Sequence, residues 1–180
     1  PFAVDIVNND PLPSIKLNKL GLPYVFKSHQ LQDIFSIDIA ISSGTTISSQ
    51  IIDKVGFFNE ALFIDHVYTE WCLRCRHMGL QIFQTPKAVM KHNIGNNRKK
   101  FGPITIQIHP PERCYYQMRN SLSLLKFKHI PKALAIYDIL STLFNRLFLL
   151  FISDCKKDYF IALCKGIKDG LFINVEPKSY

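Results

Sequence analysis

The chain has 180 residues, 47% of them hydrophobic, so it can enclose a core and is not a disordered tail. Its formal net charge of +8 favours anionic partners, and its five cysteines lack the spacing of a secreted disulfide framework. Residues 87–132 hold ten Lys or Arg against one acid, Glu112, which accounts for the whole surplus. No recognition-helix, zinc-finger or RNP pattern accompanies them, so we expect no nucleic-acid partner. We expect a protein of the reducing cytoplasm.

The first third of the chain predicts strands separated by a long connection. PFAVDIV at the start predicts a strand that begins abruptly, which indicates a fragment. Residues 8–33 contain three prolines and Gly21 among mixed polar residues and predict an irregular surface excursion. Residues 35–42 are loosely alternating and β-branched, and predict a second strand that leads into SGTT.

Two short helices are predicted from their end signals. Ser48 or Ser49 can cap a helix because a hydroxyl accepts hydrogen bonds from first-turn amides, and Gly56 can stop it in a left-handed conformation. In the same way Thr69 is a candidate N-cap and Gly79 a candidate stop for a second helix.

The rest of the chain changes from strands to helices, which predicts an α/β protein. We expect a region 1–109 that carries the strands and a helical region 110–180. The expected strands are 80–84, 88–92 and 104–109, and the expected helices are 112–127, 131–152 and 154–170.

The helix expected at 132–152 has an almost continuous apolar face. Its polar exceptions fall on one stripe: Asp138, Thr142, Asn145 and Arg146. Because they interrupt the apolar run, we expect a helix that does not span a membrane but lies on its surface, packs in a core or forms a dimer. The neighbouring basic segment favours the membrane surface.

The densest group of reactive side chains lies between residues 60 and 76. It comprises Glu60, Asp65, His66, Tyr68, Glu70, Trp71, Arg74 and Arg76. Acids at the start of a helix suit base chemistry and hydroxyl binding, but a surface turn with helix-capping acids has the same pattern. Cys72 and Cys75 form a lone CxxC, which is a weak zinc signal and favours inert thiols one turn apart.

The longer string is more specific. VGFFNEALFIDHVYTEWCLRCRHMGLQIF, followed by HNIG and HPPERCYYQMRN, resembles the rhamnosyltransferases among the inverting family 2 glycosyltransferases, from the strand before SSGTT through Gly170. The resemblance implies the C-terminal, acceptor-side part of a GT-A fold, followed by a helical segment that associates with a membrane. It also implies transfer of a sugar from a nucleotide donor to an acceptor hydroxyl with inversion, with a carboxylate base and a divalent metal, Mg or Mn.

The resemblance implies a catalytic group made of Asp65, Tyr68 and Glu70. The related pattern is F-I-D-x-V-D-x-E-W, whose second Asp is the expected base, and this chain has Tyr68 there. A phenol is a poor base at neutral pH. Either Asp65 or Glu70 substitutes, or catalysis is impaired.

Further roles follow from the resemblance alone. Glu70 is expected to bind acceptor hydroxyls, and Arg74 to serve the acceptor or buttress the acids. Trp71 is a sugar-stacking platform or a core residue. Ser43 and Gly44 match small residues that let a sugar approach the backbone.

Three more positions concern charged ligands. His92 is expected either to bind the donor's metal or to be a structural residue at a strand end. Arg113 and Arg119 are expected to hold the diphosphate of a lipid-linked acceptor, or else to pack along an ordinary helix.

Together these features predict a sugar transferase of surface polysaccharide synthesis, making O-antigen or capsule. Its expected partners are a nucleotide sugar such as dTDP-rhamnose and a polyprenyl-linked saccharide, at the inner face of the cell membrane. The chain has no Asp-x-Asp segment after several strands, so we expect it to lack donor binding on its own. The alternative is an inactive remnant or a module that binds a membrane surface or a partner.

Overall fold

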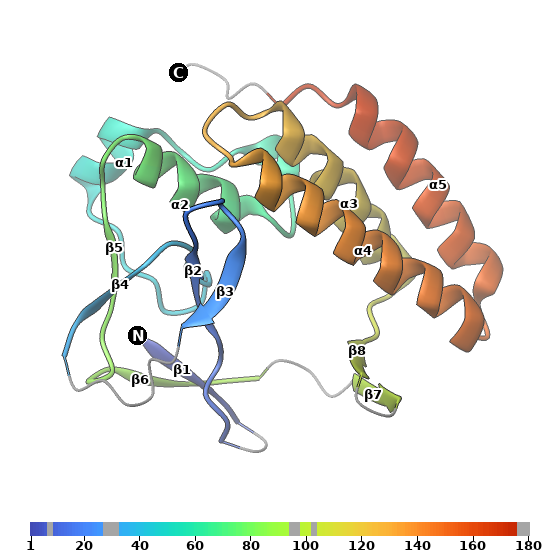
Figure 1. Cartoon of the computed structure of the whole chain (residues 1–180), viewed down its shortest axis with the longest axis horizontal. Coiled ribbons are helices and arrows are strands. Elements are labelled where there is room, and N and C mark those ends of the chain that lie inside the picture. The colour runs from blue at the N-terminus through green and yellow to red at the C-terminus, as the bar shows by residue number, and fades with distance from the viewer. Residues whose placement is uncertain (7–8, 27–32, 94–97, 102–103, 176–180) are drawn as a thin grey trace. The chain divides into compact units, whose positions relative to one another are not determined.

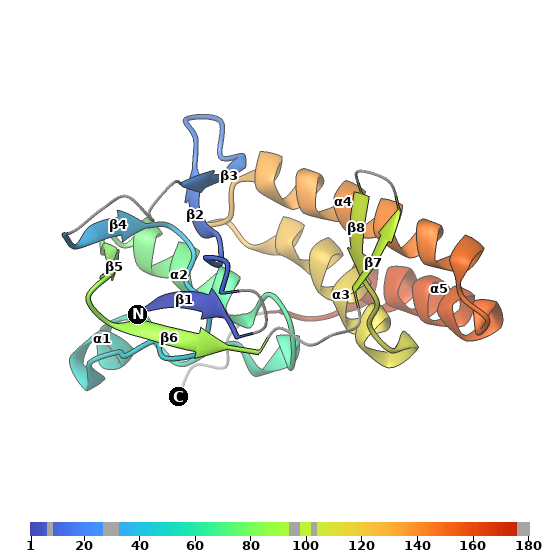
Figure 2. The same ribbon diagram turned by 90° about the horizontal axis from the view of Figure 1, so that it is seen from below.

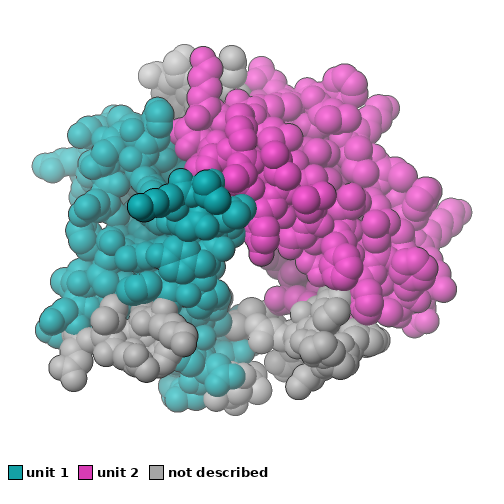
Figure 3. All heavy atoms as spheres, in the orientation of Figure 1, with its two compact units in different colours: residues 1–58, 68–94 teal, residues 59–67, 95–180 magenta. Residues whose placement is uncertain are grey.

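The computed structural model describes residues 1–6, 9–26, 33–93, 98–101 and 104–175 (Figure 1). The chain forms two compact units, coloured separately in Figure 3. Unit 1 contains residues 1–58 and 68–94, and unit 2 contains residues 59–67 and 95–180. The units therefore interleave in sequence, whereas we expected one division between residues 109 and 110.

The described strands of unit 1 form pairs. Three sheets of two strands each result: β1 (Phe2–Asp5) runs parallel to β6 (Val89–His92), β2 (Ser14–Leu17) antiparallel to β3 (Pro23–Phe26), and β4 (Phe35–Ile37) antiparallel to β5 (Ile82–Gln84). Figure 2 shows β1 and β6 side by side. The strand expected at 35–42 is shorter than predicted and ends at Ile37.

The β2–β3 hairpin shows that the irregular excursion predicted for 8–33 was wrong for residues 14–26, while residues 8 and 27–32 lie outside the described residues. Asn18 organises its turn, since its Oδ1 accepts hydrogen bonds from the amides of Leu20 and Leu22 at 2.9 and 3.0 Å. Gly21 supplies the left-handed residue with a φ of +80°. The prolines lie at or outside the strand ends, where a missing N–H costs little.

The short helices of the first half confirm most of the predicted end signals. Ser48 caps α1 (Ser49–Val55) by accepting from the amide of Ile51, and Gly56 ends it with a φ of +88°. Helix α2 (Val67–His77) begins before Thr69, so Thr69 is not its N-cap. Gly79 follows its end with a φ of +76°.

Unit 2 is built on three helices that lie side by side (Figure 1). They are α3 (Pro111–Ser123), α4 (Lys132–Ile152) and α5 (Lys156–Phe172), with the short 3₁₀ segment η2 (Leu124–Lys126) after α3. All three agree with the predicted helices to within a few residues. The hairpin of β7 (Arg98–Phe101) and β8 (Ile104–Gln107) precedes them, and only β8 was predicted.

Two glycines allow α5 to approach α3 closely. A Cβ at Gly166 would lie 2.8 Å from the carbonyl oxygen of Tyr115, and a Cβ at Gly170 would lie 2.8 Å from that of Arg119. The two positions are four residues apart and so share one helix face. A side chain at either would push the helices apart.

Helix α4 is the one helix of the described residues that is long and apolar enough to cross a membrane, with a mean hydropathy of 1.6. Only the length and composition of α4 support a membrane span. The polar stripe in its sequence had led us to expect a helix that does not span a membrane.

Candidate functional site

A strained loop follows the 3₁₀ segment η1 (Glu60–Leu62) in unit 2. We call residues 63–66 the FIDH loop. Three of them, Phe63, Asp65 and His66, have φ angles of 59–60°, a left-handed conformation that is uncommon outside glycine. Such strain persists only where neighbouring groups hold the backbone in place.

Asn120, from α3, holds this backbone. Its amide nitrogen donates to the carbonyl oxygens of Leu62, Ile64 and Asp65 at 2.8, 2.7 and 3.2 Å, and Asn120 is fully buried. One buried amide thus fixes the path of the loop.

The carboxylate of Asp65 binds Arg113 of α3 through both oxygens. Nε and Nη2 of Arg113 donate to Oδ2 and Oδ1 at 3.0 and 2.8 Å. The hydrogen bonds that Arg113 donates to the Asp65 carboxylate raise the pKa of Arg113 above its ordinary value. The side chain of Arg113 is 40% exposed, against 18% for that of Asp65.

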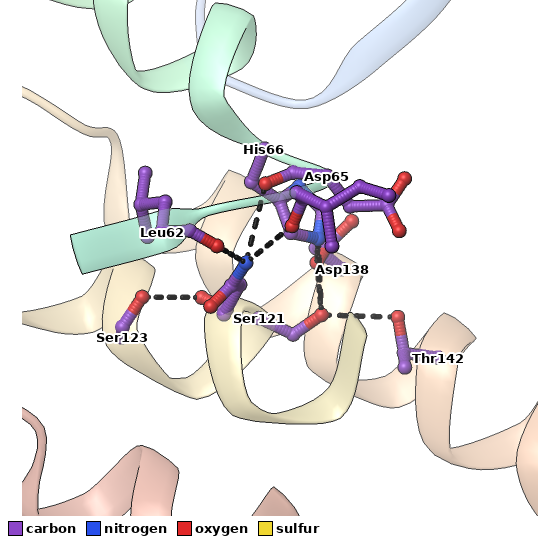
Figure 4. Close-up of polar contacts among 9 residues, drawn as sticks. Leu62, Asp65, His66, Ser121, Ser123, Asp138 and Thr142 are labelled. Atoms are coloured by element: carbon purple, nitrogen blue, oxygen red, sulfur yellow. Dashed lines mark hydrogen bonds and ion pairs between the residues drawn. The ribbon is translucent and has the colours of Figure 1, made fainter. Parts of the chain in front are cut away.

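His66 enters a polar network between α3 and α4 (Figure 4). Its Nε2 lies 3.3 Å from Oγ of Ser121 and 3.2 Å from Oδ2 of Asp138. Ser121 also donates to Asp138 at 2.5 Å and lies 3.1 Å from Thr142 Oγ1. The hydroxyl and the carboxylate meet the same ring nitrogen, so this is not the relay of a Ser-His-Asp triad, in which they bind opposite nitrogens.

The guanidinium of Arg119 contacts backbone carbonyls and an aromatic ring. Its Nη2 donates to the carbonyl oxygens of Ala61 and Leu62 at 2.7 and 2.9 Å, and its guanidinium lies 4.8 Å from the ring centre of Tyr116. These contacts agree with the packing alternative, and the expected role of Arg119 in diphosphate binding stays a prediction.

Glu70 and Arg74 form a buried pair within unit 1. Glu70 has no exposed surface, and both of its oxygens accept from Arg74 at 2.9 Å. Arg74 also donates to the carbonyl oxygens of Val55 and Phe57, at and just beyond the end of α1. Arg74 thus contacts the acid at position 70, and the expected roles of both residues toward an acceptor stay predictions.

Tyr68 and Trp71 line a cavity of about 600 Å³ in unit 1, together with Ser43 and Gly44. Tyr68 packs on Phe58 with ring centres 4.7 Å apart. Trp71 is only 4% exposed and donates from Nε1 to the carbonyl of Gly56, which favours the core role over a sugar platform.

His92 ends β6 opposite Asp5 of β1. The described residues contain no group of three metal-binding side chains, so they do not by themselves fit a divalent ion at His92. Burial raises the pKa of Cys72 to about 11 and also raises that of Cys75, which agrees with inert thiols.

Asp65, Arg113 and Arg119 were predicted as site residues, but the hydrogen bonds between Asp65 and Arg113 were not predicted. Asn120 and Ser121 were missed as contacts of the FIDH loop. A signal existed for part of the network, because Asp138 and Thr142 belong to the polar stripe noted on α4.

The chain matches no protein-family model and no solved structure. It is 33% identical over 171 residues to the dTDP-rhamnosyl transferase RfbF of Shigella flexneri. The aligned region covers 95% of this chain and 58% of RfbF, so the chain spans less than two thirds of that relative. Over nearly its whole length the chain is therefore similar to part of a rhamnosyltransferase, which confirms the resemblance predicted from its motifs.

Proposed function

We propose that this chain forms the acceptor-side part of an inverting, family 2 glycosyltransferase of GT-A type. It would serve the transfer of rhamnose from dTDP-rhamnose, or a related sugar from its nucleotide, to a polyprenyl-linked saccharide in O-antigen or capsule synthesis. The similarity to RfbF supports the donor class. The observation that carries the proposal is that the two motifs of the resemblance, FIDH and R-x-YY-x-x-RN, meet in unit 2 through Asp65, Arg113 and Asn120.

Arg113 is the residue to which we assign acceptor binding. Its planar guanidinium suits a phosphate or a pair of hydroxyls, and Asp65 fixes its orientation with two hydrogen bonds. Asn120 in turn fixes the backbone that carries Asp65. The guanidinium of Arg113 is therefore already oriented before a ligand binds, so binding need not order this side chain.

Each candidate for the general base is already paired or packed in this chain. Asp65 and Glu70 are each engaged through both oxygens by an arginine, so neither matches an available proton acceptor. The position of the expected base carries Tyr68, which packs on Phe58. These facts favour a second candidate, a noncatalytic module that retains acceptor or membrane binding.

A divalent metal is proposed for the complete reaction only through the resemblance. The described residues do not fit such an ion, so no step assigned to this chain depends on it. The lipid-linked acceptor also leads us to propose a peripheral location at the cytoplasmic face of the membrane.

Transfer can be tested by placing this chain into RfbF in exchange for the region it matches. The hybrid is incubated with dTDP-rhamnose and polyprenyl-linked saccharide, and dTDP release and product mass are followed. We expect Arg113→Lys, which keeps the charge but loses the fork, to raise the acceptor KM and leave the donor KM unchanged. A change confined to the donor KM would refute the role given to Arg113.

Substitution Tyr68→Asp tests the missing base in the same hybrid. A positioned general base contributes about 10²–10⁴-fold to a rate, so we expect turnover to rise at least about a hundredfold. The matched control is Tyr68→Asn, which has a similar size and no basic group. An equal rate for both variants would favour the noncatalytic module.

A further inference from the structure

Helix α4 has its polar side turned inward. Asp138 and Thr142 contact Ser121 of α3, and Arg146, which is 7% exposed, donates from Nη1 to Sγ of Cys114 at 2.6 Å. All of these partners lie within unit 2, where α3 and α4 run side by side (Figures 1 and 2). Three of the four residues of the polar stripe, Asp138, Thr142 and Arg146, thus contact α3.

The opposite side of α4 is apolar and exposed. We call it the α4 face; its members are between 43% and 79% exposed and follow each other at spacings of three or four residues: Ile136, Leu140, Phe144, Leu147 and Phe151. A helix on the surface of a water-soluble domain has the reverse arrangement, with apolar residues inward. A continuous apolar stripe of this size marks a surface that another apolar phase or partner covers.

Positive charge gathers at the start of α4, where Lys128 precedes the helix and Lys132 begins it, both exposed. After the helix, exposed Lys156 and Lys157 are balanced by exposed Asp154 and Asp158. Lysines beside an apolar helix face suit an anionic lipid surface, because each gains from the surface potential while the apolar side chains enter the acyl boundary. A second copy of the chain fits less well, since the same lysines would bring like charges together.

We infer that the α4 face docks into the interface of an anionic lipid bilayer, with α4 lying parallel to the membrane. To span the bilayer, α4 would have to leave α3 and expose Asp138 and Arg146 to hydrocarbon, which is costly. The inference names the surface that would hold the chain at its proposed membrane location. It rests on the proposed function in one respect, because the lipid-linked acceptor is the reason for placing the chain at a membrane. Binding can be measured without donor or acceptor sugar, so it can fail independently of transfer.

Vesicle sedimentation with the whole chain tests the inference. We expect binding to vesicles of phosphatidylcholine with phosphatidylglycerol, and much weaker binding to phosphatidylcholine alone. The double substitution Leu140→Glu and Phe144→Glu should lower partitioning of the chain onto vesicles at least about a hundredfold, since each change removes one apolar side chain that the bilayer would bury. Changing Lys128 and Lys132 to Ser should lower it about fivefold each.

Leu20→Glu is the matched control, because Leu20 is a 73% exposed leucine in the turn of the β2–β3 hairpin. It should bind vesicles like the unchanged chain. Unchanged vesicle binding by the double variant, with its helical circular dichroism intact, would overturn the inference. So would an absence of vesicle binding combined with self-association that the double variant abolishes.

Tryptophans placed singly at positions 136, 144 and 151 distinguish the parallel orientation from a spanning one. Positions 136 and 151 are separated by about 22 Å along a helix axis. Quenching by lipids brominated at defined depths should report one shallow depth for all three tryptophans. Depths that change steadily from 136 to 151 would show a spanning helix and refute the parallel orientation.

Discussion

Replacing Asn120 by Ala should destabilise unit 2 more than any other single polar substitution in α3. The change removes the amide that donates to Leu62, Ile64 and Asp65, and the oxygen that accepts from Nε of Arg119 at 2.9 Å. Two N–H groups and one acceptor are lost at a net value of about 1 kcal/mol each, so the free energy of unfolding should fall by about 3 kcal/mol. Part of that loss reflects carbonyl groups left without their donor in a buried site.

The assay is urea unfolding followed by far-ultraviolet circular dichroism, because α3, α4 and α5 supply most of the helical signal. With a slope near 2 kcal/mol per molar urea, a loss of about 3 kcal/mol lowers the midpoint by about 1.5 M. Fluorescence of Trp71, the single tryptophan, reports unit 1 in the same samples.

Asn145→Ala is the matched control. Asn145 lies on α4 and makes no side-chain hydrogen bond within the described residues. Its removal should change the midpoint by a few tenths of a molar at most. If Asn120→Ala shifts the midpoint no further than Asn145→Ala does, the FIDH loop is not held by Asn120 and the account of the site fails.

Three further outcomes are expected. Gly166→Ala should cost about 1–3 kcal/mol of stability in urea unfolding, because its Cβ would lie 2.8 Å from the Tyr115 carbonyl; a neutral effect would contradict the close helix contact. Burial, followed by nearby positive charge, lowers the pKa of His109, so the unfolded chain binds more protons and the free energy of unfolding should fall as pH drops below about 6.5. His109→Asn should flatten this dependence of the free energy of unfolding on pH, and an unchanged dependence would exclude His109 as its source. Cys72 should react with iodoacetamide at least about a hundredfold more slowly than exposed Cys155, since its pKa rises from 9.0 to about 11; peptide mass spectrometry would detect comparable rates if this is wrong.

Helices could be predicted well from this sequence because their signals are local. The three long helices follow from periodicity and from breakers such as Pro131, and α1 follows from Ser48 and Gly56. The β2–β3 hairpin was missed because three prolines outweighed the turn signal of Asn18 and Gly21. Prolines at strand ends do not prevent the strands from pairing, so the number of prolines in this segment was a poor guide to its structure.

The candidate site could be predicted only in part, because its contacts join residues far apart in the chain. Asp65 and Arg113 were both named, yet no local pattern indicates that two hydrogen bonds link them across 48 positions. Asn120 was part of a motif, but its burial is a tertiary property. The acids at 65 and 70 looked alike in sequence, and only the structure reveals that each is paired with its own arginine.

Asp65 and the position of the expected base, residue 68, belong to different compact units. Asp65 belongs to unit 2, where Arg113 and Asn120 hold it, while Tyr68 belongs to unit 1 and packs on Phe58. The hydrogen bonds that hold Asp65 come from α3, whereas position 68 contributes a ring that packs on Phe58. An aspartate at that position could be lost, or restored, without loosening the loop. Stability measured for Asn120 variants and turnover measured for Tyr68 variants should accordingly vary independently, because they report separate sets of contacts.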